Sequence, residues 1–447
     1  MEVFFLRKVW IILGCVLGVL ALTWVLRTVY IVNYDPMRAF TVRATPSPAP
    51  QKTKVAAAAT PKPTLSPEEE LVRQADADFM QDRVNILLVG FDESEERNDE
   101  TTDVYRNKKN NFRSDVLMLV AVNFAKQSVH MISIPRDTYA QIYNTRGRWK
   151  INAAFAKGGA AKGDGFTYAM KTVELLMGVP VTYYAGVDMK GLKALVDTIG
   201  GVEYDVDVEI HLNGRTLETG VQHMDGQQVL DYCRARKGIS TDLGRNDRQQ
   251  RMLLAVFEKM KKQNMLVKLP QMYAAVKDDV YTNLDMAQIA ALATFALKLD
   301  ASSFKRTTLS GEYVSNVYNA SYYVLKNKEL SKLVKEEFGI TFKRESKYDL
   351  TKVKRDKAAA EAAKAAEQME EIASSLTMPA DTTGAYDNSL MDAARASAQI
   401  LQHAIDEEAS ESEIRRLQDS YMRDMAKVLR QNNITGGVPD ALKTLVP

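Results

Sequence analysis

Five arginines within twenty residues form the densest group of side chains in this chain that could do chemistry. They lie in the segment YCRARKGISTDLGRNDRQQR, which begins at Tyr232 and ends at Arg251. Guanidinium groups that converge on one place repel one another unless an anion lies between them, and their forked donors match phosphate oxygens. The segment therefore predicts a site for a phosphate-bearing ligand.

Two parts of this segment could present arginines to the same ligand. Arg234 and Arg236 are two residues apart, so on a strand they would point to one face. Arg245, Arg248 and Gln249 have the i, i+3 and i+4 spacing that places side chains on one face of a helix. Because only a short turn separates the two parts, we expect the two faces to meet.

The alternative is that these arginines are solvated or paired with nearby acids such as Asp231, Asp242 and Asp247. Arg251 in particular is expected to lie farther round the helix, in solvent. A nucleic-acid partner is not supported, because the net charge is only +2 over 447 residues and no aromatic side chains interleave with the arginines.

Charged side chains also follow three predicted strands. The run NILLVGFD ends at Asp92, SVHMISIPRD ends at Arg136 and Asp137, and VTYYAGVD ends at Asp188. In open α/β sheets, ligands bind beyond the carboxyl ends of the strands. These side chains are therefore candidates for a site at one edge of a sheet.

A second carboxylate, Asp115, begins the strand DVLMLVAVN. If this strand lies antiparallel to the strand before it, Asp115 comes close to Asp92. Two carboxylates at one edge would bind a hard divalent cation such as Mg²⁺. For each acid alone, a helix cap, a turn or a surface ion pair is the simpler interpretation, whereas the joint pattern favours the cation.

Other kinds of active site lack support in this sequence. The four histidines show no metal-ligand spacing, and neither a G-x-S-x-G motif nor a phosphate-binding P-loop is present. Zinc hydrolase, serine hydrolase and nucleotide triphosphatase chemistry are therefore not predicted.

The elements that must hold these groups alternate between apolar strands and helical patterns. The alternation predicts an α/β fold over residues 81–342, an αβα sandwich with a mixed central sheet. Long helices are expected at 245–262, 287–297 and 328–338.

An apolar run at the N-terminus predicts a membrane anchor. Residues 9–26 contain no charge over 18 positions, which is long enough to span a bilayer. We expect a cytoplasmic N-terminus at 1–8, a single transmembrane helix within 9–32 and an extracellular Pro/Ala-rich spacer at 33–80. A cleaved signal peptide is the alternative.

The C-terminal part, residues 343–447, is predicted to be a helical and partly low-complexity tail. Residues 355–373 favour a helix but offer little apolar face, so a solvated helix is expected. Residues 391–405 and 413–429 look amphipathic and predict a helical hairpin or a tail that binds a protein partner.

Four motifs, found in order behind the anchor, resemble those of the LytR-CpsA-Psr family. They are FRSDVLMLVAVN, SIPRDTY, KINAAFAKGG and YCRAR with DLGRNDRQQ, within about 83–342. The resemblance implies an enzyme at the outer face of a Gram-positive type membrane. Such an enzyme moves a glycopolymer, a wall teichoic acid or a capsule, from an undecaprenyl pyrophosphate carrier to peptidoglycan.

The resemblance also implies roles for individual residues. Asp92 and Asp115 match the family's magnesium-binding acids, and Arg136 matches the arginine of its IPRD motif. The whole set expected around the pyrophosphate is Arg136, Lys150, Arg234, Arg236, Arg245, Arg248 and Gln249, with Asn152 beside Lys150 in the KIN segment. The acceptor hydroxyl needs a base, for which Asp115 and Asp137 are both open, although an acid tied to a cation is a poor base.

A polyprenyl tail would need an apolar slot as well. The residues that could line it are Met252, Leu253, Leu254, Val256 and Phe257, with plain core packing as the alternative.

Two alternative functions stay open: a lipid pyrophosphatase that uses water as acceptor, and a non-catalytic wall-polymer-binding or regulatory membrane protein. Cys233 and Lys237 differ from the residues that the family motif usually has at these positions. Because neither difference removes a charged group, they concern the details of the substrate and not the class of enzyme.

Overall fold

The structure, a computed structural model, describes residues 66–92, 113–212, 214–235, 242–276, 280–317, 320–375 and 389–431. The predicted anchor and Arg236 lie outside these ranges. None of the helices within them combines the length and the apolar character that crossing a bilayer requires.

A six-stranded mixed sheet forms the centre of the fold, in the order β11-β6-β1-β2-β3-β12. Strand β2 is antiparallel to both β1 and β3, whereas β1 is parallel to β6 and β3 is parallel to β12. The predicted mixed α/β architecture is confirmed. The strands are β1 (Arg83–Phe91), β2 (Ser114–Asn123), β3 (Ser128–Ser133), β6 (Tyr183–Asp188), β11 (Val280–Thr282) and β12 (Phe304–Thr308).

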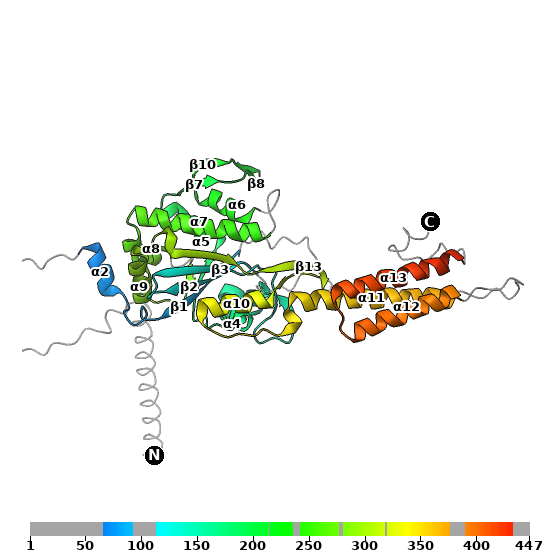
Figure 1. The fold of residues 1–447 in the computed structure, drawn as a ribbon. Coiled ribbons are helices and arrows are strands. Elements are labelled where there is room, and N and C mark those ends of the chain that lie inside the picture. The colour runs from blue at the N-terminus through cyan, green and yellow to red at the C-terminus, as the bar shows by residue number, and fades with distance from the viewer. Residues whose placement is uncertain are drawn as a thin grey trace, which may run out of the picture. The chain divides into compact units, whose positions relative to one another are not determined.

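Side chains that alternate along the strands enter two separate cores, one on each face of the sheet. Leu87 and Val89 of β1 pack in the core that includes helices α4 and α10, whereas Val84 and Ile86 pack in the core that includes α9. Figure 1 shows α4 and α10 on one side of the sheet and α5 and α7 on the other. The helices around the sheet are α3 (Ala153–Lys157), α4 (Gly165–Met177), α5 (Met189–Thr198), α6 (Gly226–Arg234), α7 (Asp242–Lys262), α8 (Leu269–Val276), α9 (Met286–Leu297) and α10 (Asn327–Phe338).

The strand directions bring the predicted acids to one edge of the sheet. Strands β1, β3 and β6 end at this edge, and the antiparallel strand β2 begins there. Phe91 of β1 pairs with Ser114 of β2 on one side and with Asp188 of β6 on the other. Asp92 and Asp115 follow directly after this pair, so the antiparallel arrangement expected from the sequence is confirmed.

In the part of the chain that the structure describes, four short two-stranded sheets lie outside the central sheet. Residues 202–210, an alternating pattern that indicates a strand, contribute to two of these sheets, and neither pairs with the central sheet. These small sheets are β4 (Tyr139–Gln141) with β5 (Arg148–Lys150), β7 (Val202–Val206) with β10 (Gly220–Met224), β8 (Ile210–Leu212) with β9 (Arg215–Leu217), and β13 (Gly311–Val317) with β14 (Ala320–Leu325).

Part of the predicted spacer is a helix, α2 (Pro67–Gln74). Ser66 and Glu69 form a capping box at its start, which satisfies two backbone donors that a helix end leaves open. Leu71 is buried with Val267 and Ala290, so this segment belongs to the folded domain.

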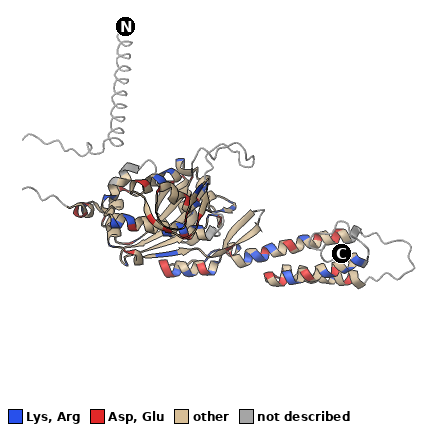
Figure 2. Ribbon diagram, turned by 90° about the horizontal axis from the view of Figure 1, so that it is seen from above, with Lys and Arg blue, Asp and Glu red and all other residues tan. Residues whose placement is uncertain are grey.

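The C-terminal helices form a unit with its own core. Ala358, Ala362 and Met369 of α11 are buried against α12 and α13, so the expectation of a solvated helix was wrong. Small alanine side chains let the helices approach closely, which the weak apolar pattern of α11 concealed. The predicted hairpin is confirmed, and Figure 2 shows Lys and Arg interspersed with Asp and Glu along these helices. They are α11 (Leu350–Ser375), α12 (Ser389–Asp406) and α13 (Glu411–Gln431).

Arg344 ties the start of the tail to the domain. It is buried, and its Nη2 donates to the carbonyl oxygen of Tyr139 at 2.6 Å, while its Nη1 donates to the carbonyl oxygen of Tyr348 at 3.2 Å. Burial lowers the pKa of Arg344 to about 10. The segment after the last family motif therefore supports β4, which follows the IPRD motif directly.

Candidate active site

Two arginine–carboxylate pairs meet at the edge where β1 and β3 end and β2 begins. Nη1 of Arg136 lies 2.7 Å from Oδ1 of Asp115, and Nη2 of Arg234 lies 3.1 Å from Oδ2 of Asp92. Asp92 is almost fully buried, whereas Arg234 is partly exposed. The structure thus brings together four of the residues that the sequence selected.

A third pair extends this edge toward the KIN segment. Nζ of Lys150 lies 3.2 Å from Oδ1 of Asp137. The backbone N–H of Asn152 donates to the carbonyl oxygen of Arg136 at 3.1 Å, and the N–H of Ser114 donates to that of Asn152 at 3.4 Å. The KIN segment is therefore hydrogen-bonded both to the loop after β3 and to the start of β2.

Arg234 is the last residue of helix α6 and does not lie on a strand, as one expectation had it. The helix begins at Gly226, and the N-cap residue before it, Asp225, forms a capping box with Gln228. Because α6 ends at Arg234, its last carbonyl oxygens lack partners within the helix and need donors from elsewhere.

Helix α7 supplies these donors. Nη2 of Arg248 donates to the carbonyl oxygen of Ala235 at 2.5 Å, and its Nε donates to that of Tyr232 at 3.3 Å. Nε2 of Gln249 donates to the carbonyl oxygen of Cys233 at 3.2 Å. Arg248 is only 3% exposed. Its guanidinium is thus directed at the end of α6, which differs from the expectation that it faces the ligand.

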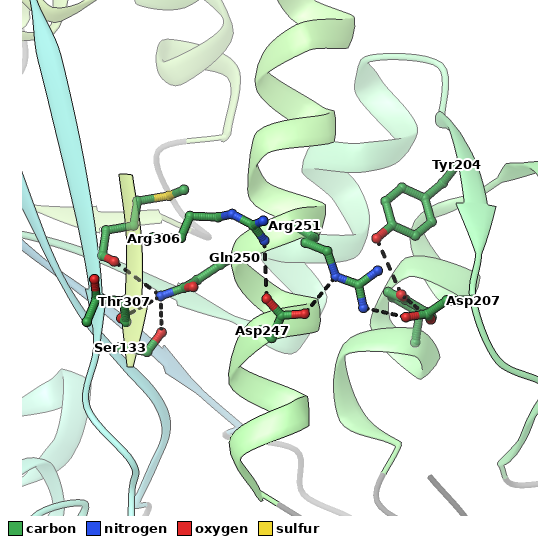
Figure 3. A network of polar contacts seen from close by, with 10 residues as sticks. Ser133, Tyr204, Asp207, Asp247, Gln250, Arg251, Arg306 and Thr307 are labelled. Carbon is green, nitrogen blue, oxygen red and sulfur yellow. Dashed lines mark hydrogen bonds and ion pairs between the residues drawn. The ribbon is translucent and has the colours of Figure 1, made fainter. Parts of the chain in front are cut away.

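Gln250 fixes α7 to the central sheet, as Figure 3 shows. Its Nε2 donates to Oγ of Ser133 at 2.9 Å and to the carbonyl oxygens of Thr307 at 2.9 Å and Met131 at 3.2 Å. This buried amide therefore sets the position of α7 against β3 and β12. No local spacing in the sequence indicates this role of Gln250, because its partners lie 57 to 119 residues away along the chain.

Arg251 is not solvated, which corrects a second expectation. Its Nη2 lies 2.5 Å from Oδ2 of Asp207 and its Nε lies 2.9 Å from Oδ2 of Asp247 (Figure 3). Asp207 also accepts a hydrogen bond from Oη of Tyr232 at 2.7 Å. Burial would raise the pKa of Asp207, but the hydrogen bonds from Tyr232 and Arg251 hold it below its ordinary value. The tyrosine of the YCRAR motif is thus a partner in this network.

A cavity of about 720 Å³ lies between the sheet and helices α5, α6 and α7. Leu88, Met118 and Ala185 form part of its wall, and they belong to the face of the sheet opposite to Leu87 and Val89. Its apolar lining also includes Leu192, Leu195, Val196, Ile210, Leu212, Val229, Leu230, Met252, Leu253 and Val256.

Three of the five residues expected to line an apolar slot do so, namely Met252, Leu253 and Val256. Leu254 is outside the lining, and Phe257 packs against Phe304 with ring centroids 4.7 Å apart. The alternative of plain core packing therefore holds for Phe257.

The polar part of the lining contains predicted site residues. These are Asp115, Arg234, Arg245 and Gln249. Arg245 and Gln249 are one helical turn apart, whereas Arg248 is rotated by about 100° from Gln249 and so points elsewhere. Cys233 also lines the cavity, and burial raises the pKa of its thiol to about 12, which makes it a poor nucleophile.

The described residues contain no group of three or more His, Cys, Asp and Glu side chains that could hold a metal ion. Mg²⁺ is commonly bound through one or two carboxylates together with water and substrate phosphate oxygens. The two hard oxygen donors, Asp92 and Asp115, fit that mode.

The model of the LytR_cpsA_psr family matches residues 50–338. The chain belongs to this family. The resemblance drawn from the four motifs is therefore confirmed, and all the site residues described above lie within the matched range. Helices α11 to α13 lie beyond it.

Curated relatives of this family member carry transferase names. The chain is 35% identical over 207 residues to a polyisoprenyl-teichoic acid–peptidoglycan teichoic acid transferase TagU of Bacillus mycoides, a match that covers 46% of this chain and 62% of the relative. A protein of the same name from Halalkalibacterium halodurans is 30% identical over 257 residues, with 57% of this chain and 77% of the relative covered.

A solved structure of the family shares the fold. The crystal structure of B. subtilis TagV is 27% identical, with a TM-score of 0.50 over 59% of this chain and 99% of that chain. The match thus covers more than half of this chain and almost all of that one.

Proposed function

We propose that this protein transfers an anionic glycopolymer, of the wall teichoic acid or capsule type, from a polyprenyl pyrophosphate carrier to peptidoglycan. The names of the curated relatives support a teichoic acid donor and a peptidoglycan acceptor. The observation that carries the proposal is an apolar cavity whose polar lining holds Asp115, Arg234 and Arg245. Such a cavity suits a ligand with a long apolar tail and a multiply charged head.

The apolar part of the cavity would hold the polyprenyl chain. Its volume of about 720 Å³ falls within the range of roughly 300–1,000 Å³ that is typical of small-molecule sites. Since isoprene units cannot form hydrogen bonds, a lining of Leu, Val and Met side chains stabilises them mainly through burial from water.

The sheet edge would hold the pyrophosphate. Arg234 and Arg245 from two helices, with Arg136 from the loop after β3, offer forked donors to the phosphoryl oxygens. Transfer of a phosphoryl group depends mainly on positioning and on neutralising negative charge, and preformed arginine side chains do both. Arg236 and Lys150 complete the proposed set.

Asp92 and Asp115 would hold Mg²⁺, with phosphate oxygens of the donor completing its coordination. When bound, the ion would polarise a phosphoryl oxygen and reduce the repulsion of an approaching hydroxyl. Arg136 and Arg234 keep these two carboxylates in place before the donor binds.

The acceptor is a sugar hydroxyl whose proton must pass to a base. Both candidates are paired with a basic side chain, but Asp115 would also be a ligand of the proposed metal ion, which weakens it as a base. We therefore assign the base to Asp137, which lies beside Lys150 at the same edge. The change Asp137→Asn is expected to lower kcat roughly 10²–10⁴-fold with little change in the KM of the acceptor.

A membrane anchor within residues 9–32 would hold this domain at the outer face of the membrane, where both substrates are found. The test uses the full chain in detergent with a lipid-linked polymer labelled in its phosphate, with and without peptidoglycan. Transfer predicts that the label enters peptidoglycan. Release of labelled free polymer in place of wall label supports the pyrophosphatase alternative, and binding without turnover supports the non-catalytic one.

A further inference from the structure

The hairpin of β4 and β5 exposes two large aromatic side chains near the active-site edge, Tyr143 in its loop and Trp149 in β5. Tyr143 is 37% exposed and Trp149 is 42% exposed. Large aromatic side chains in water lose the free energy that burial would provide, so a pair in one short hairpin points to a binding surface.

Contacts of Tyr143 and Asn144 hold the start of the loop, directly after β4, in place. Its N–H donates to Oγ1 of the buried Thr172 at 3.1 Å, and its ring meets that of Tyr168 edge to face with centroids 5.5 Å apart. Nδ2 of Asn144 donates to Oη of Tyr168 at 3.3 Å. The loop is thus anchored on α4, and the Tyr143 side chain is exposed from a fixed backbone.

Trp149 is also oriented by its neighbours. Nζ of Lys157, on α3, lies 3.9 Å from the centre of the indole ring. A Cβ atom at Gly147 would lie 2.3 Å from the indole nitrogen, so a glycine is needed for the ring to lie across the turn. A ring that is held in place before a ligand arrives loses little conformational entropy on binding.

The β4–β5 hairpin and the cavity lie on opposite sides of the active-site edge. Ala140 of β4 and Phe155 of α3 pack in the core on one face of the sheet, whereas the cavity opens on the opposite face. Asp115 and Arg136 lie at the edge between them. Lys150 of β5 contacts Asp137 at this edge, and Trp149, the residue before it, faces the other side of the hairpin against Lys157 of α3. A ligand that leaves the cavity across the edge would therefore reach the β4–β5 hairpin.

We propose that the β4–β5 hairpin is the subsite for the acceptor glycan strand, with Trp149 of β5 packed against the C–H face of a pyranose ring. This inference rests on the proposed function. In phosphoryl transfer, the attacking and leaving oxygens lie roughly in line through phosphorus. Because the leaving lipid phosphate lies on the cavity side, the attacking hydroxyl comes from the side of the loop.

The acceptor hydroxyl oxygen forms a bond to the phosphorus atom nearest the polymer, and the bond from that phosphorus to the bridging oxygen breaks. The hydroxyl proton passes to Asp137, and the polyprenyl phosphate leaves with the bridging oxygen. The basic residues Arg146, Arg148 and Lys157 around the loop suit the carboxylates that peptidoglycan strands carry.

A kinetic experiment on the full chain tests the subsite. Trp149→Ala is expected to raise the KM of soluble glycan strands roughly tenfold, with kcat and the KM of the lipid donor unchanged, and Trp149→Phe is expected to restore most of the affinity. The matched control is Tyr313→Ala, an equally exposed tyrosine at 39% on β13, which is expected to change neither KM. An unchanged acceptor KM in Trp149→Ala overturns the proposal, as does a rise in the donor KM alone.

Fluorescence provides a readout that does not depend on turnover. The chain contains three tryptophans, Trp10, Trp24 and Trp149, so the full chain with Trp10→Phe and Trp24→Phe reports on Trp149 alone. Glycan strands are expected to shift its emission in a saturable way, and the lipid donor is not. A flat titration with glycan strands rejects the subsite even when transfer is normal, whereas wild-type enzyme that only hydrolyses the donor rejects the proposed function instead.

Discussion

Nη2 of Arg248 lies 2.5 Å from the carbonyl oxygen of Ala235, directly after the last residue of α6. One arginine-rich segment therefore serves two purposes. Arg234 and Arg245 line the cavity, whereas Arg248 and Arg251 hold the elements that carry them. The orientation of Arg234 toward Asp92 depends on this support.

Replacing Arg248 by methionine is expected to destabilise the fold and to weaken donor binding indirectly. The change leaves buried carbonyl oxygens without a donor, a loss of about 1–3 kcal/mol for each unsatisfied group. Urea unfolding and the donor KM measure the two effects, and Arg248→Lys should recover part of each. A variant that unfolds like the wild type but loses donor binding would instead indicate that Arg248 contacts the ligand.

Filling the cavity should block long lipid tails selectively. Leu192→Trp places a bulky ring in the lining from α5, so transfer from a long-chain polyprenyl donor should fall more than tenfold, while a short-chain analogue is used nearly as well. Lys193→Trp, on the exposed side of the same helix, is the matched control. Equal losses with long and short donors would show that the cavity does not hold the lipid tail.

The C-terminal segment should contribute to the stability of the domain through Arg344. Arg344→Ala removes donors from the carbonyl oxygens of Tyr139 and Tyr348 and is expected to lower the free energy of unfolding by about 1–3 kcal/mol or more. Arg395→Ala, an exposed arginine of α12, should change it by less than about 0.5 kcal/mol. Equal stability of the two variants would show that the tail is not coupled to β4.

The stability of the domain should decrease between pH 7.5 and 5.5 because of His130. Burial lowers the pKa of this histidine, Lys305 and Arg83 act in the same direction, and its hydrogen bond to Glu337 only partly opposes them. The folded protein therefore binds the proton less readily than the unfolded chain. Stability is complete above the unfolded pKa of about 6.5 and is lost as the pH falls below it.

Denaturant unfolding at several pH values measures this effect, which is at most about 1.4 kcal/mol per pH unit for one proton. His130→Gln should remove this part of the slope, whereas His403→Gln on the exposed side of α12 should keep it. A slope that is unchanged in His130→Gln would assign the pH dependence to other groups.

The sequence predicts the parts of this protein that depend on local pattern. Strand ends follow from apolar runs, whereas the approach of Asp115 to Asp92 was expected only if the second strand lies antiparallel to the first, as it does. The roles of Gln250 and Arg251 depend on contacts with strands and loops far away in the sequence, and no local spacing reveals them. The core of α11 was missed because alanines contribute packing without a marked apolar stripe.

Asp92 and Asp115 are proposed to form a magnesium-dependent transfer site at the mouth of a lipid cavity. Transfer of labelled polymer to peptidoglycan over a Mg²⁺ titration tests this proposal, with the full-length wild type, Asp92→Asn, Asp115→Asn and the surface control Asp392→Asn. We expect Mg²⁺-dependent wall label in the wild type and in Asp392→Asn, and a loss of at least about 10²-fold in both edge variants. Undiminished transfer by the folded edge variants, or wall label that does not respond to removal of Mg²⁺, would rule out a magnesium site on these two carboxylates.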